Sequence, residues 1–150
     1  MQYWLMKSEA DCYSIDDLKR DKTTPWTEVR NYQARNFMCD MKKGDKALFY
    51  HSNGGDETGV VGEMKVAKQA YADPTQFKKG EYFDEKATKT NPRWFCVDVS
   101  FVEKFKHPVY LSHLKNDPKF TDMTVAQKGN RLSVMPVAKK HYEAVLKMSK

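Results

Sequence analysis

Four segments of the chain combine aromatic side chains with small polar side chains or arginine. They cover residues 26–36, 49–53, 92–94 and 129–134. Aromatic rings can stack on the face of a nucleobase, while amide, hydroxyl and backbone groups reach its hydrogen-bonding edge. Arginines beside such a pocket suit the flanking phosphates, because a guanidinium forms paired hydrogen bonds with anionic oxygens. These residue types therefore predict a protein that captures a single base.

The same side chains also fit structural roles. Trp26 and Trp94 belong to a residue type that is mostly buried in cores. Asn31 can cap a helix, and Arg35 can form a surface ion pair with Asp40. Ser133 stands in an otherwise apolar strand and is the hardest of these residues to explain by structure alone. The residues by themselves leave both interpretations open.

Sequence motifs of known catalytic sites are largely missing. The P-C-x-x-C motif of zinc deaminases does not occur, and Gly54-Gly55 lacks the Lys-Ser/Thr that completes a phosphate-binding loop. Cys39 and His51 could form a nucleophile pair, but such pairs can be drawn in almost any chain. The three cysteines are far apart, which favours reduced thiols in a cytoplasmic protein over disulfides or a zinc site. We therefore expect no metal, no cofactor and no enzymatic activity.

The charge of the chain favours a polyanionic partner. The formal net charge is +6, from 26 basic and 20 acidic residues. Most of the basic residues are scattered lysines, which are typical of a solvated surface. Four of the five arginines, in contrast, fall within the four segments: Arg30, Arg35, Arg93 and Arg131. No apolar run approaches the roughly 18 residues that a membrane span needs, so no membrane partner is expected.

The hydrophobic pattern predicts the elements that must position these residues. Strands are expected over residues 3–7, 47–51, 59–71, 94–102 and 132–137, with strict alternation in the third and fourth. Helices are expected after the capping box at Ser14, over 32–41 after Asn31, and over 138–148. Several antiparallel strands with short helices between them indicate an α+β domain on a curved sheet or small barrel.

Four stretches, taken together and in this order, closely resemble the EVE domain family: residues 6–9, 29–36, 49–53 and 129–137. The resemblance extends over essentially the whole chain. It implies one domain over residues 1–150 with a PUA-like fold, which is a small twisted β-barrel with peripheral short helices. It also implies binding of nucleic acid that carries a modified base, such as 5-methylcytosine or 5-hydroxymethylcytosine in DNA, or a modified base in RNA. We expect a monomer.

The resemblance further implies a site. Its pocket would be lined by Trp26, Tyr32, Tyr50, His51, Ser52, Asn53, Trp94 and Ser133, with Asn31 and Asn36 at the entrance. Phosphates would be bound by Arg30, Arg35 and Arg131. One departure is visible, because Glu28 stands where the family pattern Trp-x-Gly-Val-Arg has glycine. If that glycine has a positive φ angle, glutamate would disfavour the same path for the loop that carries Trp26.

An alternative function comes from the related ASCH domains, some of which hydrolyse modified nucleosides. In that interpretation Lys7 and Glu63 would serve as nucleophile and acid/base. The two functions can be told apart with Lys7→Ala, which in a hydrolase would stop turnover of a modified nucleoside and leave affinity largely intact.

Overall fold

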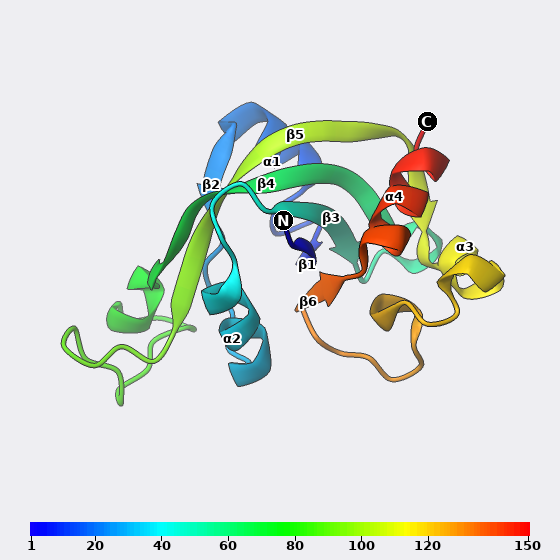
Figure 1. Ribbon diagram of the computed structural model, residues 1–150. Coiled ribbons are helices and arrows are strands. Elements are labelled where there is room, and N and C mark those ends of the chain that lie inside the picture. Colours follow the sequence, from blue (N-terminus) through cyan, green and yellow to red (C-terminus); the bar gives the residue numbers. More distant parts are fainter.

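The computed structural model describes all residues, 1–150, and its centre is one six-stranded sheet with the order β2-β5-β4-β3-β1-β6. The strands are β1 (Tyr3–Glu9), β2 (Thr23–Pro25), β3 (Lys46–Ser52), β4 (Gly59–Ala72), β5 (Phe95–Tyr110) and β6 (Val134–Val137). β1 and β3 run parallel, and every other pair is antiparallel. The sheet is strongly curved (Figure 1), but its edge strands β2 and β6 do not pair, so the barrel stays open.

Four α-helices and four short 3₁₀ turns connect the strands. The helices are α1 (Ile15–Asp21), α2 (Tyr32–Asp40), α3 (Leu111–Asn116) and α4 (Lys139–Met148). The capping box predicted at Ser14 is present, because its hydroxyl accepts from the Asp17 amide and the Asp17 carboxylate accepts from the Ser14 amide. Asn31 caps α2 through the Ala34 amide, 2.9 Å away. None of the helices is both long and apolar enough to cross a membrane.

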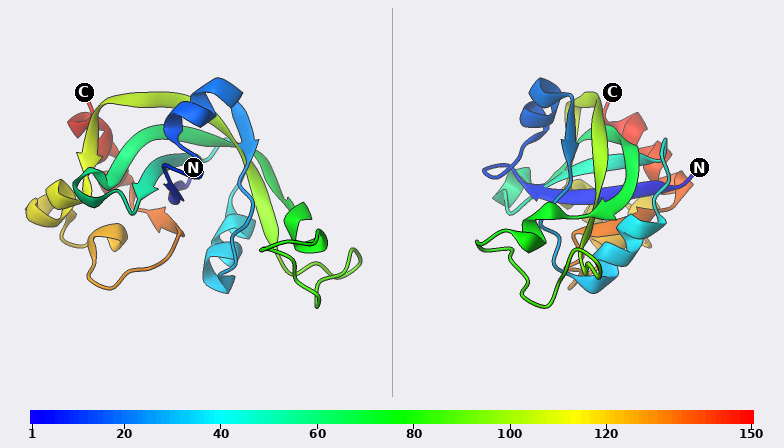
Figure 2. Two further views of the ribbon diagram at one scale, coloured as in Figure 1. Left: turned by 180° about the vertical axis from the view of Figure 1, so that it is seen from behind. Right: turned by 90° about the vertical axis from the view of Figure 1, so that its left-hand side faces the viewer.

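The two faces of the sheet bury separate hydrophobic clusters. Along β1, Trp4 and Met6 enter the first cluster, while Leu5 enters the second. α1 and α2 pack on the first cluster, and α3 and α4 pack on the second. In the left view of Figure 2, α3 and α4 lie toward one end of the curved sheet, and α1 and α2 lie toward the other.

Some local expectations were wrong. Strict alternation fails in β4, where bulges place Val61 and Met64 in the first cluster but Val60 in the second. β5 continues to Tyr110, beyond the predicted end. β2 and α3 carry no clear pattern because they are only 3 and 6 residues long. The parallel pairing of β1 with β3 was also not expected, since parallel strands need a long crossover that the pattern alone does not identify.

Candidate functional site

A cleft of about 840 Å³ opens at the carboxyl end of β1. This volume lies within the range of about 300–1,000 Å³ that is typical of small-molecule sites. Its walls come from the end of β1, the connection between β2 and α2, the segment just before β6, and a loop of residues 78–93 that we call the projecting loop. The lining residues are Lys7, Ser8, Glu9, Cys12, Tyr13, Thr24, Pro25, Trp26, Thr27, Glu28, Val29, Arg30, Asn31, Glu81, Tyr82 and Ser133.

The floor of the cleft joins β1 to the segment before β6. The Lys7 amide donates to the Ser133 carbonyl at 2.8 Å, which places both side chains at the same opening. Lys7 extends over the ring of Tyr50, with its ammonium 5.4 Å from the ring centre. Burial lowers the pKa of Lys7 below its usual value. Trp26 forms part of the wall but exposes only 7% of its surface, and it packs edge-on against Phe49.

Asp73 holds the wall that carries Trp26 and Glu28. Its fully buried carboxylate accepts from the Glu28 amide at 2.7 Å, from the Thr75 amide at 2.8 Å and from Arg30 Nη1 at 3.3 Å. A buried carboxylate needs such partners, because an isolated charge in a core is strongly unfavourable. Asp73 therefore fixes the path of the connection between β2 and α2.

Glu28 adopts the conformation that the family's glycine would favour. Its φ angle is +75°, in the left-handed region, and its amide is held by Asp73. The loop thus keeps this path even though a side chain is present, at a strain of about 1–2 kcal/mol.

Arg30 ties the same wall to the projecting loop. Its guanidinium donates to the Asp73 carboxylate, the Val29 carbonyl and the Thr75 hydroxyl. It also donates twice to the Tyr82 carbonyl, from Nη2 at 2.7 Å and from Nε at 3.3 Å. All five N–H groups of the guanidinium are therefore engaged within the protein. This geometry speaks against the predicted phosphate-binding role of Arg30.

The charges around the cleft do not favour an anion inside it. Three carboxylates line it, on Glu9, Glu28 and Glu81. Two cationic side chains line the cleft, those of Arg30 and Lys7. Arg30 forms an ion pair with Asp73, whereas Lys7 has no carboxylate within ion-pair distance. Such a cleft fits a neutral base with amino donors better than a phosphate, because carboxylates accept from groups such as the N4 amine of cytosine.

Tyr32 and Trp94 were predicted to line the pocket, but both lie outside the cleft. Their rings stack on each other with centroids 4.8 Å apart, and Trp94 donates from Nε1 to Asp84 at 2.8 Å. The Arg35 guanidinium covers the Tyr32 ring at 4.7 Å and donates to the Arg93 carbonyl. These groups join α2 to the projecting loop.

The segment of residues 50–53 is also absent from the cleft lining. Tyr50 is 97% buried in the second cluster because alternation along β3 turns it inward. His51 Nε2 accepts from the Ile15 amide at 3.1 Å and so positions α1. Asn53 donates to Glu9 at 2.6 Å and thereby orients a cleft carboxylate, while Ser52 pairs with Glu9 in the β1–β3 register.

Of the other predicted residues, Trp26, Asn31 and Ser133 do line the cleft. The Asn31 side chain oxygen is used as a helix cap, and the Asn36 oxygen accepts from Arg35. Arg131 is exposed two residues from Ser133. Lys7 was not predicted as a binding residue of the cleft. Glu81 and Tyr82 were not predicted either, because their lysine-rich surroundings resemble any surface loop.

His51 predicts a pH dependence of stability. Burial lowers its pKa, an effect that Asp16 partly opposes and Lys104 reinforces. The unfolded chain therefore binds more protons near the ordinary histidine pKa of about 6.5. Stability is fully present above that pH and falls as the pH drops through it.

The check is urea denaturation at pH 7.5 and 5.5. We expect His51→Gln, whose amide oxygen can still accept from Ile15, to lose less stability over this interval than the wild type. His113→Gln, on the exposed face of α3, serves as the control and should behave like the wild type. An equal pH dependence in His51→Gln and the wild type would contradict this assignment.

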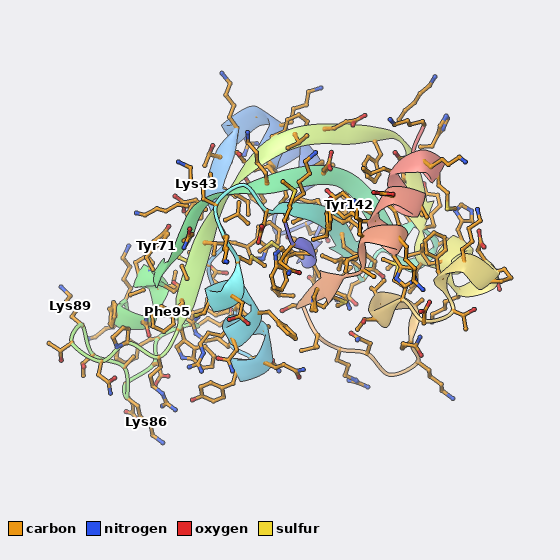
Figure 3. All side chains as sticks on the ribbon, in the orientation of Figure 1. Lys43, Tyr71, Lys86, Lys89, Phe95 and Tyr142 are labelled. Carbon is orange, nitrogen blue, oxygen red and sulfur yellow. The ribbon has the colours of Figure 1, made fainter.

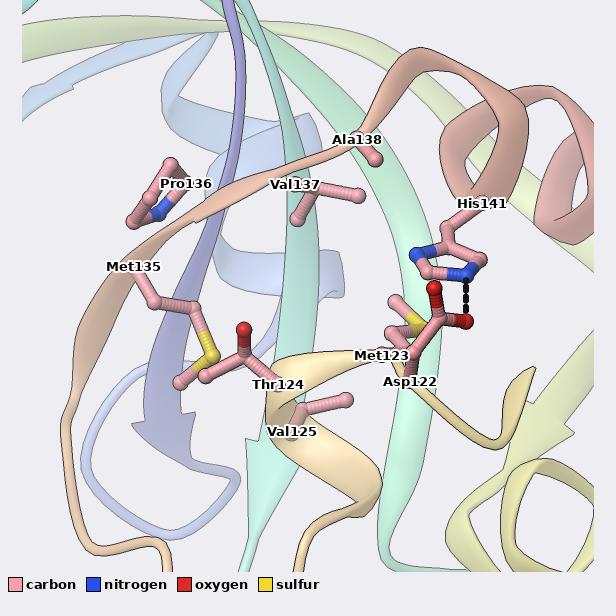
Figure 4. A pocket seen from close by; sticks show the side chains of 9 residues that line it. All are labelled: Asp122, Met123, Thr124, Val125, Met135, Pro136, Val137, Ala138 and His141. Carbon is pink, nitrogen blue, oxygen red and sulfur yellow. Dashed lines mark hydrogen bonds and ion pairs between the residues drawn. The ribbon is translucent and has the colours of Figure 1, made fainter.

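A second, smaller pocket lies beneath α4 (Figure 4). It measures about 120 Å³ and is lined by Asp122, Met123, Thr124, Val125, Met135, Pro136, Val137, Ala138 and His141. His141 Nε2 lies 3.0 Å from an Asp122 carboxylate oxygen across it. Its volume is below the usual range of ligand sites. No group of three or more His, Cys, Asp or Glu side chains is arranged to hold a metal ion.

Comparisons with known proteins agree on one family. Human thymocyte nuclear protein 1 is 40% identical over 165 residues, which cover 97% of this chain and 73% of that protein. A crystal structure of a protein from Pseudomonas syringae is 44% identical, with a TM-score of 0.93 and 99% of both chains covered. The expectation of a cytoplasmic protein is wrong by this comparison, because the relatives are named as nuclear proteins.

The human protein has also been crystallised in complex with DNA that contains 5-methylcytosine. The sequence in that structure is 38% identical to this chain, and the two structures superpose with a TM-score of 0.91. The match covers 100% of this chain and 98% of that one. This likeness confirms the expected α+β, PUA-like fold, here as an open and twisted sheet. The EVE domain matches residues 2–148. The chain therefore belongs to the EVE domain family.

Proposed function

We propose that this protein reads a modified base in DNA, such as 5-methylcytosine, by capturing that base in the cleft between Trp26, Lys7 and Ser133. The observation that carries the proposal is the cleft itself, which is large enough to admit a base and whose charges disfavour a phosphate. The human relative that was crystallised with 5-methylcytosine DNA supports the same ligand class. The phosphates on either side of the base would lie outside, near Arg35 and Arg131.

The arrangement supports binding over hydrolysis. Lys7 lines the cleft, but Glu63 does not. The buried Glu63 carboxylate accepts from the Tyr142 hydroxyl and lies 3.8 Å from Lys46, on the side of the second cluster. Lys7 therefore has no acid/base partner at Glu63 in the cleft, which weighs against the amidohydrolase alternative.

The expected selectivity depends on the modification. One methyl group in an apolar slot is worth about 1–3 kcal/mol, or about 10- to 200-fold in discrimination. A hydroxymethyl group that hydrogen-bonds to Ser133 could be distinguished more sharply, because a base without it would leave a buried polar group unpaired.

Two natural cysteines provide the test. Cys12 is exposed and lines the cleft, whereas Cys39 is exposed on α2 and does not line it. A methylated DNA strand at about ten times its Kd should slow alkylation of Cys12 about 10-fold, since only free protein reacts. Cys39 lies one turn of α2 from the proposed phosphate contact Arg35 and outside the cleft, so it should be slowed much less. Each thiol is compared with its own rate without DNA, because burial raises the pKa of Cys39.

The unmodified strand at the same concentration should protect Cys12 less. Equal protection of the two cysteines would place the DNA elsewhere. Stronger protection of Cys12 by a modified RNA strand than by the DNA strand would make the protein an RNA reader and would overturn the proposal.

A further inference from the structure

Phe83 is exposed, and its ring has no aromatic packing partner in the fold. It exposes 47% of its surface, and its ring forms no aromatic or cation–π pair in the structure. Tyr32 is similarly exposed, but its ring is stacked on Trp94 and covered by Arg35. Phe83 is thus the one strongly exposed aromatic ring whose faces are not occupied by the protein.

The backbone on both sides of Phe83 is fixed. The Tyr82 carbonyl accepts from Arg30 at 2.7 Å, and the Asp84 amide donates to the Gln76 carbonyl at 3.0 Å. The Asp84 carboxylate is held by Trp94. Gln76, which is fully buried, anchors the end of the loop by accepting from the amides of Arg93 and Trp94. The projecting loop therefore presents Phe83 in a defined place.

That place is beside the cleft, on a loop in which five basic residues outnumber the three acidic ones, Glu81, Asp84 and Glu85. Tyr82, the residue before Phe83, lines the cleft. The projecting loop also carries four exposed lysines: Lys78, Lys79, Lys86 and Lys89. Figure 3 shows Lys86 and Lys89 at the outer part of this loop, away from the sheet. An apolar side chain between this cleft and a loop of net positive charge fits a nucleic-acid duplex as its partner.

We propose that Phe83 is a wedge that enters the base stack of a duplex, in the gap left by the base captured in the cleft. This inference rests on the proposed function and specifies how the protein takes its base from paired DNA. Turning a base out of a duplex disrupts its pairing and stacking. Proteins that unstack a duplex often insert an apolar side chain between base steps, which restores part of the lost stacking.

The wedge predicts a difference between duplex and single-stranded DNA. Phe83→Ala should weaken binding of a 5-methylcytosine duplex about 10-fold, in line with the stacking of one base on an aromatic ring. Binding of the same methylated sequence as a single strand should stay within about 2-fold, because no gap has to be filled there. Phe83→Trp should retain duplex binding, since a larger ring can also stack.

Fluorescence anisotropy titrations of both DNA forms measure these changes. Val102→Ala removes another exposed apolar side chain, 38% exposed on β5, and should change neither affinity. Equal loss with both DNA forms, or no loss with either, would overturn the wedge. Failure of the proposed function looks different, because wild-type protein would then show no preference for the methylated over the plain strand in either form.

Discussion

Replacing Asp73 by alanine is expected to destabilise the protein by about 3–5 kcal/mol, the range seen when one partner of a buried ion pair is removed. The substitution leaves the Arg30 guanidinium, whose side chain is 21% exposed, without its carboxylate. It also leaves the Glu28 and Thr75 amides without their acceptor. The wall of the cleft and the start of the projecting loop lose their common support.

Urea denaturation measures this effect. Asp122→Ala is the matched control, because the Asp122 carboxylate also has two partners, the Lys140 ammonium and the His141 ring, but is 65% exposed. Its loss of stability should be much smaller, because exposed ion pairs contribute little. Similar losses in the two variants would mean that the Asp73 network contributes no more than a surface ion pair.

Filling the cleft should abolish base capture. Ser133→Phe places a ring at the floor, and we expect affinity for a methylated single strand to fall about 5- to 150-fold, which corresponds to about 1–3 kcal/mol of base stacking. The preference over the plain strand should fall to about one. Weak, salt-dependent binding to the backbone should remain, because the surface cations are unchanged.

Anisotropy titrations with methylated and plain strands provide the measurement. The same substitution at Ser112, which is exposed on α3 outside the cleft, should leave both affinities unchanged. A Ser133→Phe protein that keeps its wild-type melting temperature and its preference for the methylated strand would show that the base binds elsewhere.

Local signals in the sequence predicted the elements well where one short segment determines the outcome. The capping box at Ser14 and the cap at Asn31 both start helices where expected, since each depends on only a few neighbouring residues. The bulges of β4 were not predictable in this way. They depend on how β4 fits against β5 across the sheet, and sequence alternation contains no information on that fit.

The site was harder to predict than the fold. Trp94 combines the features of a base platform, yet its ring is occupied by Tyr32 and its Nε1 by Asp84. Arg30 has the right chemistry for phosphate, but Asp73 and the Tyr82 carbonyl use its donors. In each case the deciding partner lies at least ten residues away in the chain. Residue type gives the chemistry that a side chain can perform, and long-range contacts decide whether it is available.

The position of β1 has a consequence for the order of folding. β1 is an inner strand that pairs with β3 on one side and, through contacts such as Tyr3 with Val137, with β6 on the other. During synthesis from the amino terminus, β3 is complete long before β6 exists, so one edge of β1 remains open and able to pair with other chains. The Lys7–Ser133 hydrogen bond can form only when β6 closes that edge. The cleft floor thus cannot form before β6 has been synthesised, and a nascent chain acquires its ligand site only with its last strand.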